Sequence, residues 1–436
     1  MPQCNLVFVF ADQMRAEAAG YAGNAAVHTP NLDRLAAEGL NFRHCISGTP
    51  VCTPWRACFL TGQYPLRHGL FLNDLRLPTD RPTFGTVLKA AGYRTGYIGK
   101  WHLDGSARSA FTPPGPRRQG FDYWAAANCD HGYMHSHYYR DTPERLYWNG
   151  YDAEAQTTLA MDFASQCGAD PFALFLSWGP PHNPYGEVPR RFLDLYPPER
   201  IPVRPNCPDP NRDDLRGYYA HVTALDEQIG RLLRRLGDNG QLERTIFIFT
   251  SDHGDMLGSH GRQRKQQPWE ESIHVPFLIR SPMQFARGRS VDTLLNVWDM
   301  MPTLLNLLDV AVPAAVQGLD LSAAVRSEAA AGPDATLAAS IAPFAEYRGL
   351  PWRAVRTRRH TYVRDLNGPW LLYDNERDPY QLQNLTGRSD AAAIQASLDA
   401  RLNELLARFD DDFQPAHEYV RRWGYNVNEN GAIPIS

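Results

Sequence analysis

The sequence lacks several features that would assign it to other classes of protein. Its formal net charge is only -4 and no basic run occurs, so we do not expect nucleic acid as a partner. No apolar run approaches the roughly 20 residues that a membrane-spanning helix requires, so we expect no membrane segment. The seven cysteines are odd in number and irregularly spaced, which fits neither a disulfide framework nor a zinc site.

The N-terminus also lacks the features of an export signal. A strand-like apolar run begins at Leu6, with no cationic region, signal core or cleavage site before it. We therefore expect a cytoplasmic protein. Of the 436 residues, 43% are hydrophobic and 21% are charged, so the composition does not indicate disorder, and the chain is long enough for a large domain with an appendage.

Short apolar runs alternate with helical patterns along most of the chain. The runs typical of buried strands are Leu6–Phe10, Tyr93–Ile98, Phe172–Leu176 and Thr245–Phe249. The clearest helical pattern is Tyr218–Leu236, which has an apolar face. This alternation predicts an α/β fold with a large, mostly parallel sheet sandwiched by helices.

The last part of the chain predicts a smaller domain. Residues 311–343, rich in Ala, Pro and Gly, predict a connection between domains. Short strands at hairpin spacing follow at 352–355, 362–364 and 370–373, and a helical pattern at 391–409 closes the domain. We therefore predict a catalytic domain of residues 1–340 and a C-terminal α+β domain of residues 341–436 with a small antiparallel sheet.

Residues 115–150 interrupt the alternation of strands and helices. They are rich in aromatic residues and histidines and predict a long irregular insertion. Long loops inside compact domains are often functional, so the insertion either forms a wall of a ligand pocket or packs on the domain as a separate apolar cluster.

Polar residues follow directly after the predicted strands. They are Asp12, Gln13, Lys100, His102, His182, Asp252 and His253. Ligands of doubly wound sheets bind outside the carboxyl ends of the strands, so we expect these side chains to meet in one site. Two carboxylates and an amide oxygen suit calcium or magnesium, while a histidine leaves manganese open. The alternative is that such residues are caps or loop contacts.

The stretch from Thr49 to Gly62 places a cysteine at a predicted helix start. Cys52 follows a loop that contains Pro50, and Pro54 and helix-compatible residues come next. At a helix N-terminus the macrodipole and the free N–H groups favour an anion, such as a thiolate or an anionic ester. Arg56, one turn further on, adds a positive charge on the same side. The alternative is a small buried thiol.

These residues resemble the signature of type I sulfatases, the formylglycine-dependent branch of the alkaline phosphatase superfamily. The matching segments are Cys-Thr-Pro-Trp-Arg followed by Leu-Thr-Gly-Gln-Tyr-Pro, Gly-Lys-Trp-His-Leu, Pro-Pro-His-Asn-Pro-Tyr and Lys-x-x-x-x-Glu-Glu-Ser, in the family's order. The resemblance implies a divalent cation and a formylglycine made from Cys52 by a maturation enzyme. Two positions depart from the pattern: Trp55 replaces a small residue, most often Ser, and Gln13 replaces an Asp.

The resemblance also implies a role for each site residue. The metal ligands would be Asp12, Gln13, Cys52, Asp252 and His253. We expect calcium, with manganese or magnesium as alternatives. A hydroxyl of the formylglycine hydrate would attack the substrate with help from Asp252, and Arg56 and Lys100 would hold the hydrate. His182 with Lys265 would protonate the leaving alcohol, and His102 would take the proton that releases the inorganic anion.

Three functional hypotheses follow from these residues. The first is a sulfatase that hydrolyses the sulfate ester of a small or carbohydrate-like alcohol. The second is a phosphonate monoester or phosphodiester hydrolase of the same superfamily. The third is an anion-binding homologue in which Trp55 blocks maturation and Cys52 stays a thiol. The sequence does not identify the alcohol, and it is compatible with an oligomer as well as with a monomer.

Overall fold

Strand β1 (Asn5–Asp12) lies at the centre of the main sheet. The protein is described by a computed structural model that covers residues 3–285, 288–328, 331–345, 347 and 349–436. All residues of β1 are buried, as expected of a strand that is covered on both faces. It pairs in parallel with β8 (Phe172–Pro181) on one side and with β9 (Thr245–Ser251) on the other. The three predicted central strands are therefore confirmed.

The main sheet continues on both sides of these strands, in the order β12-β2-β11-β9-β1-β8-β4-β5. β4 (Arg94–Lys100) and β5 (Tyr123–Ala127) extend the parallel part beyond β8. On the other side, β11 (Phe277–Arg280) pairs antiparallel with β9 and with β2 (Leu40–Phe42), and β12 (Arg289–Val291) pairs in parallel with β2. The sheet is therefore mostly parallel, as predicted.

Strand β5 lies inside the segment that we predicted to be an irregular insertion, residues 115–150. For this part the prediction is wrong, because β5 is the edge strand next to β4. Its sequence, Tyr-Trp-Ala-Ala-Ala, ends in alanines, which are weak strand formers, so the pairing with β4 rather than local propensity makes it a strand. The short strands β6 (His137–Tyr138) and β7 (Leu146–Tyr147) pair with each other within the same segment.

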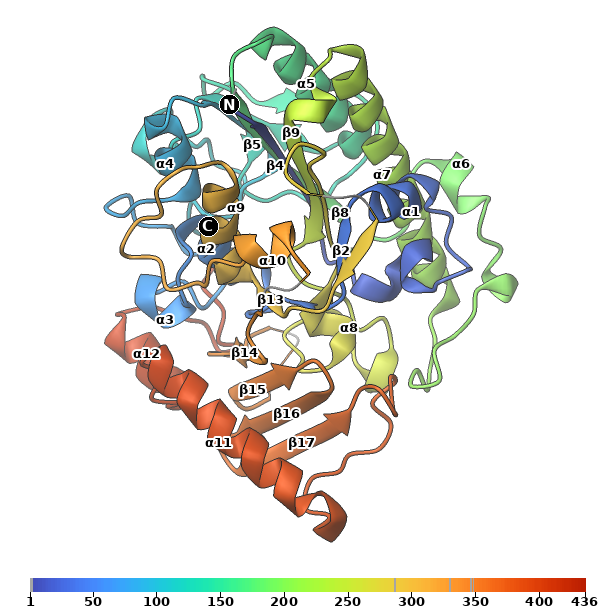
Figure 1. Cartoon of the computed structure of the whole chain (residues 1–436), viewed down its shortest axis with the longest axis vertical. Coiled ribbons are helices and arrows are strands. Elements are labelled where there is room, and N and C mark those ends of the chain that lie inside the picture. Colours follow the sequence, from blue (N-terminus) through green and yellow to red (C-terminus); the bar gives the residue numbers. More distant parts are fainter. Residues whose placement is uncertain (1–2, 286–287, 329–330, 346, 348) are drawn as a thin grey trace.

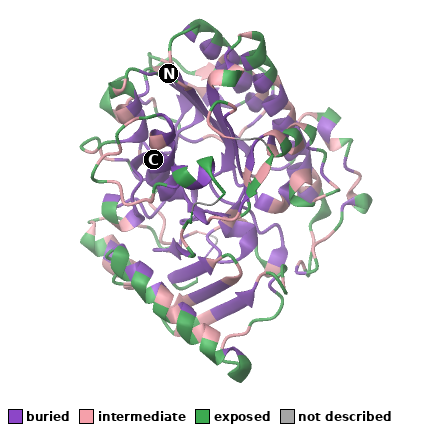
Figure 2. Ribbon diagram, viewed as in Figure 1, coloured by how far each residue is buried: buried purple, intermediate pink, exposed green. Residues whose placement is uncertain are grey.

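Helices cover both faces of the main sheet (Figure 1). One face packs on α1 (Pro30–Glu38), α5 (Asp152–Cys167) and α7 (Arg212–Asp238), and the other on α2 (Cys52–Thr61), α4 (Phe84–Ala90) and α9 (Val297–Leu307). The side chains of β1 alternate between two hydrophobic clusters: Val7 and Val9 belong to one, and Phe8 and Phe10 to the other. Figure 2 shows this sheet as almost entirely buried.

The remaining short elements connect these layers. The helices are α3 (Pro65–His68), α6 (Arg190–Leu193), α8 (Glu270–Ile273) and α10 (Ser322–Arg326). The strands β3 (Cys45–Ile46), β10 (His274–Val275) and β13 (Leu295–Asn296) form a small separate sheet. In the described parts of the chain, no helix combines the length and the apolar character that a membrane crossing requires.

The C-terminal region forms an antiparallel sheet with a long helix across it (Figure 1). Its strands are β14 (Ala335–Ser340), β15 (Trp352–Thr357), β16 (His360–Asp365) and β17 (Gly368–Asp374), followed by α11 (Ala392–Arg408) and α12 (Ala416–Arg422). The predicted hairpin strands and the closing helix are confirmed. Residues 311–343 are not merely a connection, because they contain α10 and β14. β14 lies before the predicted boundary at residue 341, and its alanines gave no strand signal.

Candidate active site

Helix α2 begins at Cys52, as the sequence predicts, and every residue of α2 is buried. The Sγ atom of Cys52 lies 3.4 Å from Nε2 of His253, 3.7 Å from Oδ1 of Asp12, 3.7 Å from Nζ of Lys100 and 3.3 Å from Nζ of Lys265. The whole chain contains only three lysines, so two of the three lie at this atom. The strand ends therefore converge on Cys52.

The charges around Cys52 favour an anion at this position. Burial and the carboxylate of Asp12 raise the pKa of the thiol, but Lys100, Lys265 and His253 outweigh them and hold it well below its usual value. A sulfate or phosphate ester group bound here would meet the same two ammonium groups. The site is thus built for negative charge, although the chain as a whole is slightly acidic.

Four side chains form a cluster that could hold a metal ion. The ligand atoms of Asp12, Cys52, Asp252 and His253 all lie within 4.8 Å of one another, and all four residues are buried. Nδ1 of His253 donates to the carbonyl oxygen of Gly254 at 3.0 Å, so Nε2 is the ring nitrogen that faces the cluster. Burial and the adjacent Asp12 raise the pKa of Asp252 to about 6. A cation between the two carboxylates would remove this repulsion.

Gln13 supplies a further candidate metal ligand beside these carboxylates. Its Nε2 donates to Oδ2 of Asp255 at 2.7 Å, and its backbone N–H donates to Oδ1 of Asp252 at 3.0 Å. Its Oε1 is buried and has no hydrogen-bond partner among the described residues. A buried amide oxygen without a partner is costly, and a hard divalent cation would satisfy it. The donor set of carboxylates, amide oxygen and imidazole therefore fits such a cation.

Arg56 lies between the two carboxylates of this cluster. Its Nη2 is 3.4 Å from Oδ2 of both Asp12 and Asp252, and its Nη1 donates to the carbonyl oxygen of Lys100 and to Oγ of Ser177, each at 2.7 Å. The guanidinium group is buried and fixed by these partners. It therefore sets the positions of the carboxylates as well as contributing positive charge.

His182 and Lys265 form a pair next to Cys52. Nε2 of His182 lies 2.8 Å from Nζ of Lys265, and its Nδ1 lies 2.7 Å from the carbonyl oxygen of Asn183. Nδ1 therefore carries the proton, and Nε2 accepts from the ammonium group of Lys265. Because Lys265 also lies next to Cys52, it links the cysteine to the histidine.

His102 is held by residues that the sequence analysis missed. Its Nε2 lies 3.0 Å from Oδ1 of Asp74, and the same carboxylate accepts two hydrogen bonds from Arg108, each at 2.7 Å. Nδ1 of His102 is buried without a partner among the described residues. Asp74 and Arg108 come from irregular loops and match no motif, so no sequence signal pointed to them. Asp255, only three residues after Asp252, did offer such a signal.

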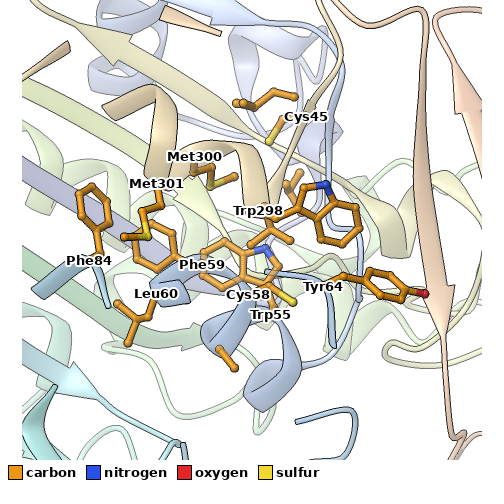
Figure 3. Close-up of a cluster of buried hydrophobic side chains, with 14 of the residues drawn as sticks. Cys45, Trp55, Cys58, Phe59, Leu60, Tyr64, Phe84, Trp298, Met300 and Met301 are labelled. Carbon is orange, nitrogen blue, oxygen red and sulfur yellow. The ribbon is translucent and has the colours of Figure 1, made fainter. Parts of the chain in front are cut away.

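Trp55, the unusual residue of the Cys52 segment, points away from the site. Its indole is 0% exposed and stacks on Phe59 at a centroid distance of 5.3 Å, next to Phe10 at 5.5 Å. Figure 3 shows it within the cluster of buried hydrophobic side chains around α2. Cys52 and Arg56 lie one turn apart on the site face, whereas Trp55 and Phe59 lie one turn apart on the core face. The folded protein therefore accommodates the tryptophan without obstructing Cys52.

Comparisons with known proteins identify the family of the chain. The family model "Sulfatase" matches residues 4–310, and the model "N-sulphoglucosamine sulphohydrolase, C-terminal" matches residues 258–408. An ulvan-active sulfatase of Formosa agariphila is 43% identical over 442 residues, which cover 99% of this chain and 86% of the relative.

Solved structures share the whole fold. A protein in complex with its substrate D-glucosamine-2-N,6-O-disulfate has a TM-score of 0.84 at 25% identity and covers 94% of this chain and 99% of its own. The phosphonate monoester hydrolase of Agrobacterium radiobacter has a TM-score of 0.75 at 22% identity, with coverages of 93% and 96%, and shows the fold alone. The predicted fold class is confirmed. The chain belongs to the sulfatase family and is a sulfuric ester hydrolase.

Proposed function

We propose that this sulfatase hydrolyses the sulfate ester of a carbohydrate, with a formylglycine made from Cys52 as nucleophile and a divalent cation as cofactor. The observation that carries the proposal is the position of Cys52, within 3.7 Å of Lys100, Lys265, His253 and Asp12. The carbohydrate is suggested by the relatives, one named as active on ulvan and another solved with a glucosamine disulfate.

The cation would be held by Asp12, Gln13, Asp252 and His253, together with the side chain at position 52. Calcium fits best because most of these donors are hard oxygens, and manganese and magnesium are the alternatives. When bound, the cation would supply positive charge that polarises a sulfuryl oxygen. The orphaned Oε1 of Gln13 supports this assignment.

The side chains around position 52 have separate roles in the reaction. A formylglycine would supply, as its hydrate, an oxygen nucleophile and a second hydroxyl. Lys100 and Lys265 neutralise charge on the non-bridging sulfate oxygens. The pair of Lys265 and His182 supplies the proton that the leaving oxygen needs, from the ammonium group that Nε2 of His182 holds in place, and Nδ1 of His102 accepts a proton when sulfate is released. Arg56 keeps its place throughout, because Ser177 and a backbone carbonyl fix it.

Mass spectrometry of the tryptic peptide His44–Arg56 tests the nucleophile. The protein should come from a host that contains a formylglycine-generating enzyme, the maturation partner that we propose. Fragmentation separates Cys45 from Cys52, and the expected result is an aldehyde at position 52 with Cys45 unchanged. A free thiol at position 52 in such a host would overturn the mechanism and favour the anion-binding hypothesis.

Turnover measurements on the same sample test the substrate and the cofactor. We expect sugar sulfates to be hydrolysed faster than a phosphonate monoester or a phosphodiester. The reverse order would favour the second hypothesis. A chelator should abolish the activity, and calcium, manganese and magnesium added back separately identify the cation that restores it. Activity that survives complete removal of divalent metal would contradict the proposed cation site.

A further inference from the structure

The insertion 115–150 reaches the active site through three alternate residues. Cys129, His131 and Tyr133 follow strand β5, and the imidazole of His131 contacts the side chains of the other two. The imidazole of His131 lies parallel to that of His182, with the ring centroids 4.2 Å apart and an interplanar angle of 12°. The sequence pattern predicts no individual role for any of the three residues, beyond a place in a candidate pocket wall.

The hydrogen bonds around His131 fix its orientation. The hydroxyl of Tyr133 donates toward the carbonyl oxygens of Gly179 and Asn183, each at 3.3 Å, so it accepts the proton on Nδ1 of His131 at 3.1 Å. Nε2 of His131 is then the acceptor, and it lies 3.4 Å from Sγ of Cys129. His131 is thus held from both of its ring nitrogens.

Tyr133 in turn is locked against the end of β8. A Cβ atom at Gly179 would lie only 2.6 Å from Cε1 of Tyr133, so the absence of a side chain at position 179 lets the ring approach the strand. The carbonyl oxygen of Asn183, toward which Tyr133 donates, is also the oxygen that holds Nδ1 of His182. One network therefore fixes His131 and the backbone on both sides of His182.

This arrangement restricts the movement of His182. One face of its ring is covered by His131, its Nδ1 is held by the carbonyl oxygen of Asn183, and its Nε2 faces Nζ of Lys265 at 2.8 Å. A general acid must keep its proton within hydrogen-bond reach of the leaving oxygen, so small rotations of this ring would cost rate.

We propose that His131 is a positioning residue that holds His182 in the orientation from which the pair of His182 and Lys265 protonates the leaving alcohol. The inference rests on the proposed function of His182 as the general acid. In that step sulfur gains a bond to the oxygen nucleophile proposed at position 52, the bond between sulfur and the bridging oxygen breaks with its electron pair left on the bridging oxygen, and one proton from the pair of His182 and Lys265 moves to that oxygen.

The dependence of rate on the leaving group tests this role. Phenyl sulfate needs the proton, because its phenol has a pKa near about 10, whereas the far more acidic phenol of 4-nitrophenyl sulfate leaves without it. We expect His131→Ala to lower kcat on phenyl sulfate by about 10- to 100-fold and on 4-nitrophenyl sulfate by less than about 3-fold. His131→Phe, which keeps a stacking ring, should restore most of the lost rate.

Two further variants make the outcome decisive. His182→Ala should show the same dependence on the leaving group, more strongly, whereas His135→Ala, at an exposed histidine of the same segment, should change neither rate. Equal losses on both esters in His131→Ala, with the dependence present in His182→Ala, would overturn the role of His131 alone. Equal losses in His182→Ala would overturn the general-acid assignment itself.

A crystal structure of His131→Ala gives a second readout that needs no turnover. We expect the ring of His182 to leave the position that the wild-type ring occupies, with its contact to Lys265 lengthened. A ring of His182 that keeps its place and its contact to Lys265 in the variant would contradict the proposal.

Discussion

Two buried ion networks in this protein differ in how completely they are satisfied. In the C-terminal region, Arg353 and Asp411 are both 0% exposed at their side chains and form a bidentate pair. Asp411 also accepts from the hydroxyl groups of Tyr64 and Tyr419 and from the backbone N–H of Phe413. The carboxylate therefore meets donors at both of its oxygens.

The network around Cys52 is equally buried but incomplete. Among the described residues, Oε1 of Gln13, Nε of Arg56 and Nδ1 of His102 have no hydrogen-bond partner. A buried polar atom without a partner is costly, and these three atoms belong to side chains of the candidate site. The comparison teaches that buried charge alone does not mark an active site: the unsatisfied network is the one that needs a ligand.

Cys52→Ala should have the largest effect of the variants proposed, and the effect should be on activity and not on stability. Removal of the proposed nucleophile is expected to lower kcat/KM on a sulfate ester by at least about 10,000-fold, with little change in the melting temperature. Cys58→Ala, at another buried cysteine of α2, is the matched control and should retain the activity. If Cys52→Ala and wild type turn over the ester at the same rate, Cys52 has no role in catalysis.

Arg353→Leu should break the other network and leave catalysis intact. It strands the buried carboxylate of Asp411, so we expect the free energy of unfolding to fall by about 3–5 kcal/mol, measured by denaturant titration. The double variant Arg353→Leu/Asp411→Leu should recover most of this loss, and the activity per folded molecule should stay at the wild-type level. A loss of activity without a loss of stability would show that the two networks are coupled.

Asp74→Asn tests a carboxylate that forms an ion pair, as Asp411 does, but that also contacts a histidine of the candidate site, His102. The amide no longer pairs with the charge of Arg108 and no longer fixes which nitrogen of His102 carries the proton, so we expect kcat to fall by about 10- to 100-fold. Asp104→Asn is the control, because Asp104 is also buried and pairs with Arg117 nearby. Equal kcat values for the two variants would argue against a special role for Asp74.

Asp152 provides a pH-dependent effect, through a buried carboxyl group that accepts a hydrogen bond from a hydroxyl group and has no ion-pair partner among the described residues. Burial raises its pKa from 3.8 to about 7, although Oγ of Ser136 donates to it at 3.0 Å. The folded state therefore binds its proton more tightly than the unfolded state. Its contribution to stability is present below about pH 4 and is lost as the pH rises toward about 7.

Asp152→Asn should remove this part of the pH dependence. Between about pH 4 and pH 7, the free energy of unfolding of the wild type should fall relative to that of the variant by at most about 1.4 kcal/mol per pH unit. Thermal unfolding of both proteins at several pH values measures the difference. Parallel curves would mean that Asp152 has an ordinary pKa in the folded protein.

The sequence predicts those parts of the molecule that depend on regular patterns. Asp12, Lys100, His182 and Asp252 could be placed together because the carboxyl ends of parallel strands meet at one edge of a sheet. β14 could not be predicted, because its alanine-rich sequence becomes a strand only by pairing with β15.

Side chains from irregular loops could not be predicted either. Asp74 and His131 lie in segments without periodicity, and only the folded chain brings them to His102 and His182. Their partners could be recognised in advance from strand ends and motifs, but the pairing itself is a property of the tertiary structure. The motif residues can therefore be recognised from the sequence, whereas the residues that hold them can be identified only from the folded structure.

The burial of Cys52 limits when a modifying enzyme could reach its thiol. Cys52 is 1% exposed and Trp55 is 0% exposed, so an enzyme that made the proposed formylglycine would have to reach this segment before α2 packs against the sheet. Roughly 380 residues follow Cys52, and the ribosome needs tens of seconds to add them. Under the proposed mechanism, the active fraction of the protein would depend on the rate of oxidation relative to the rate of folding.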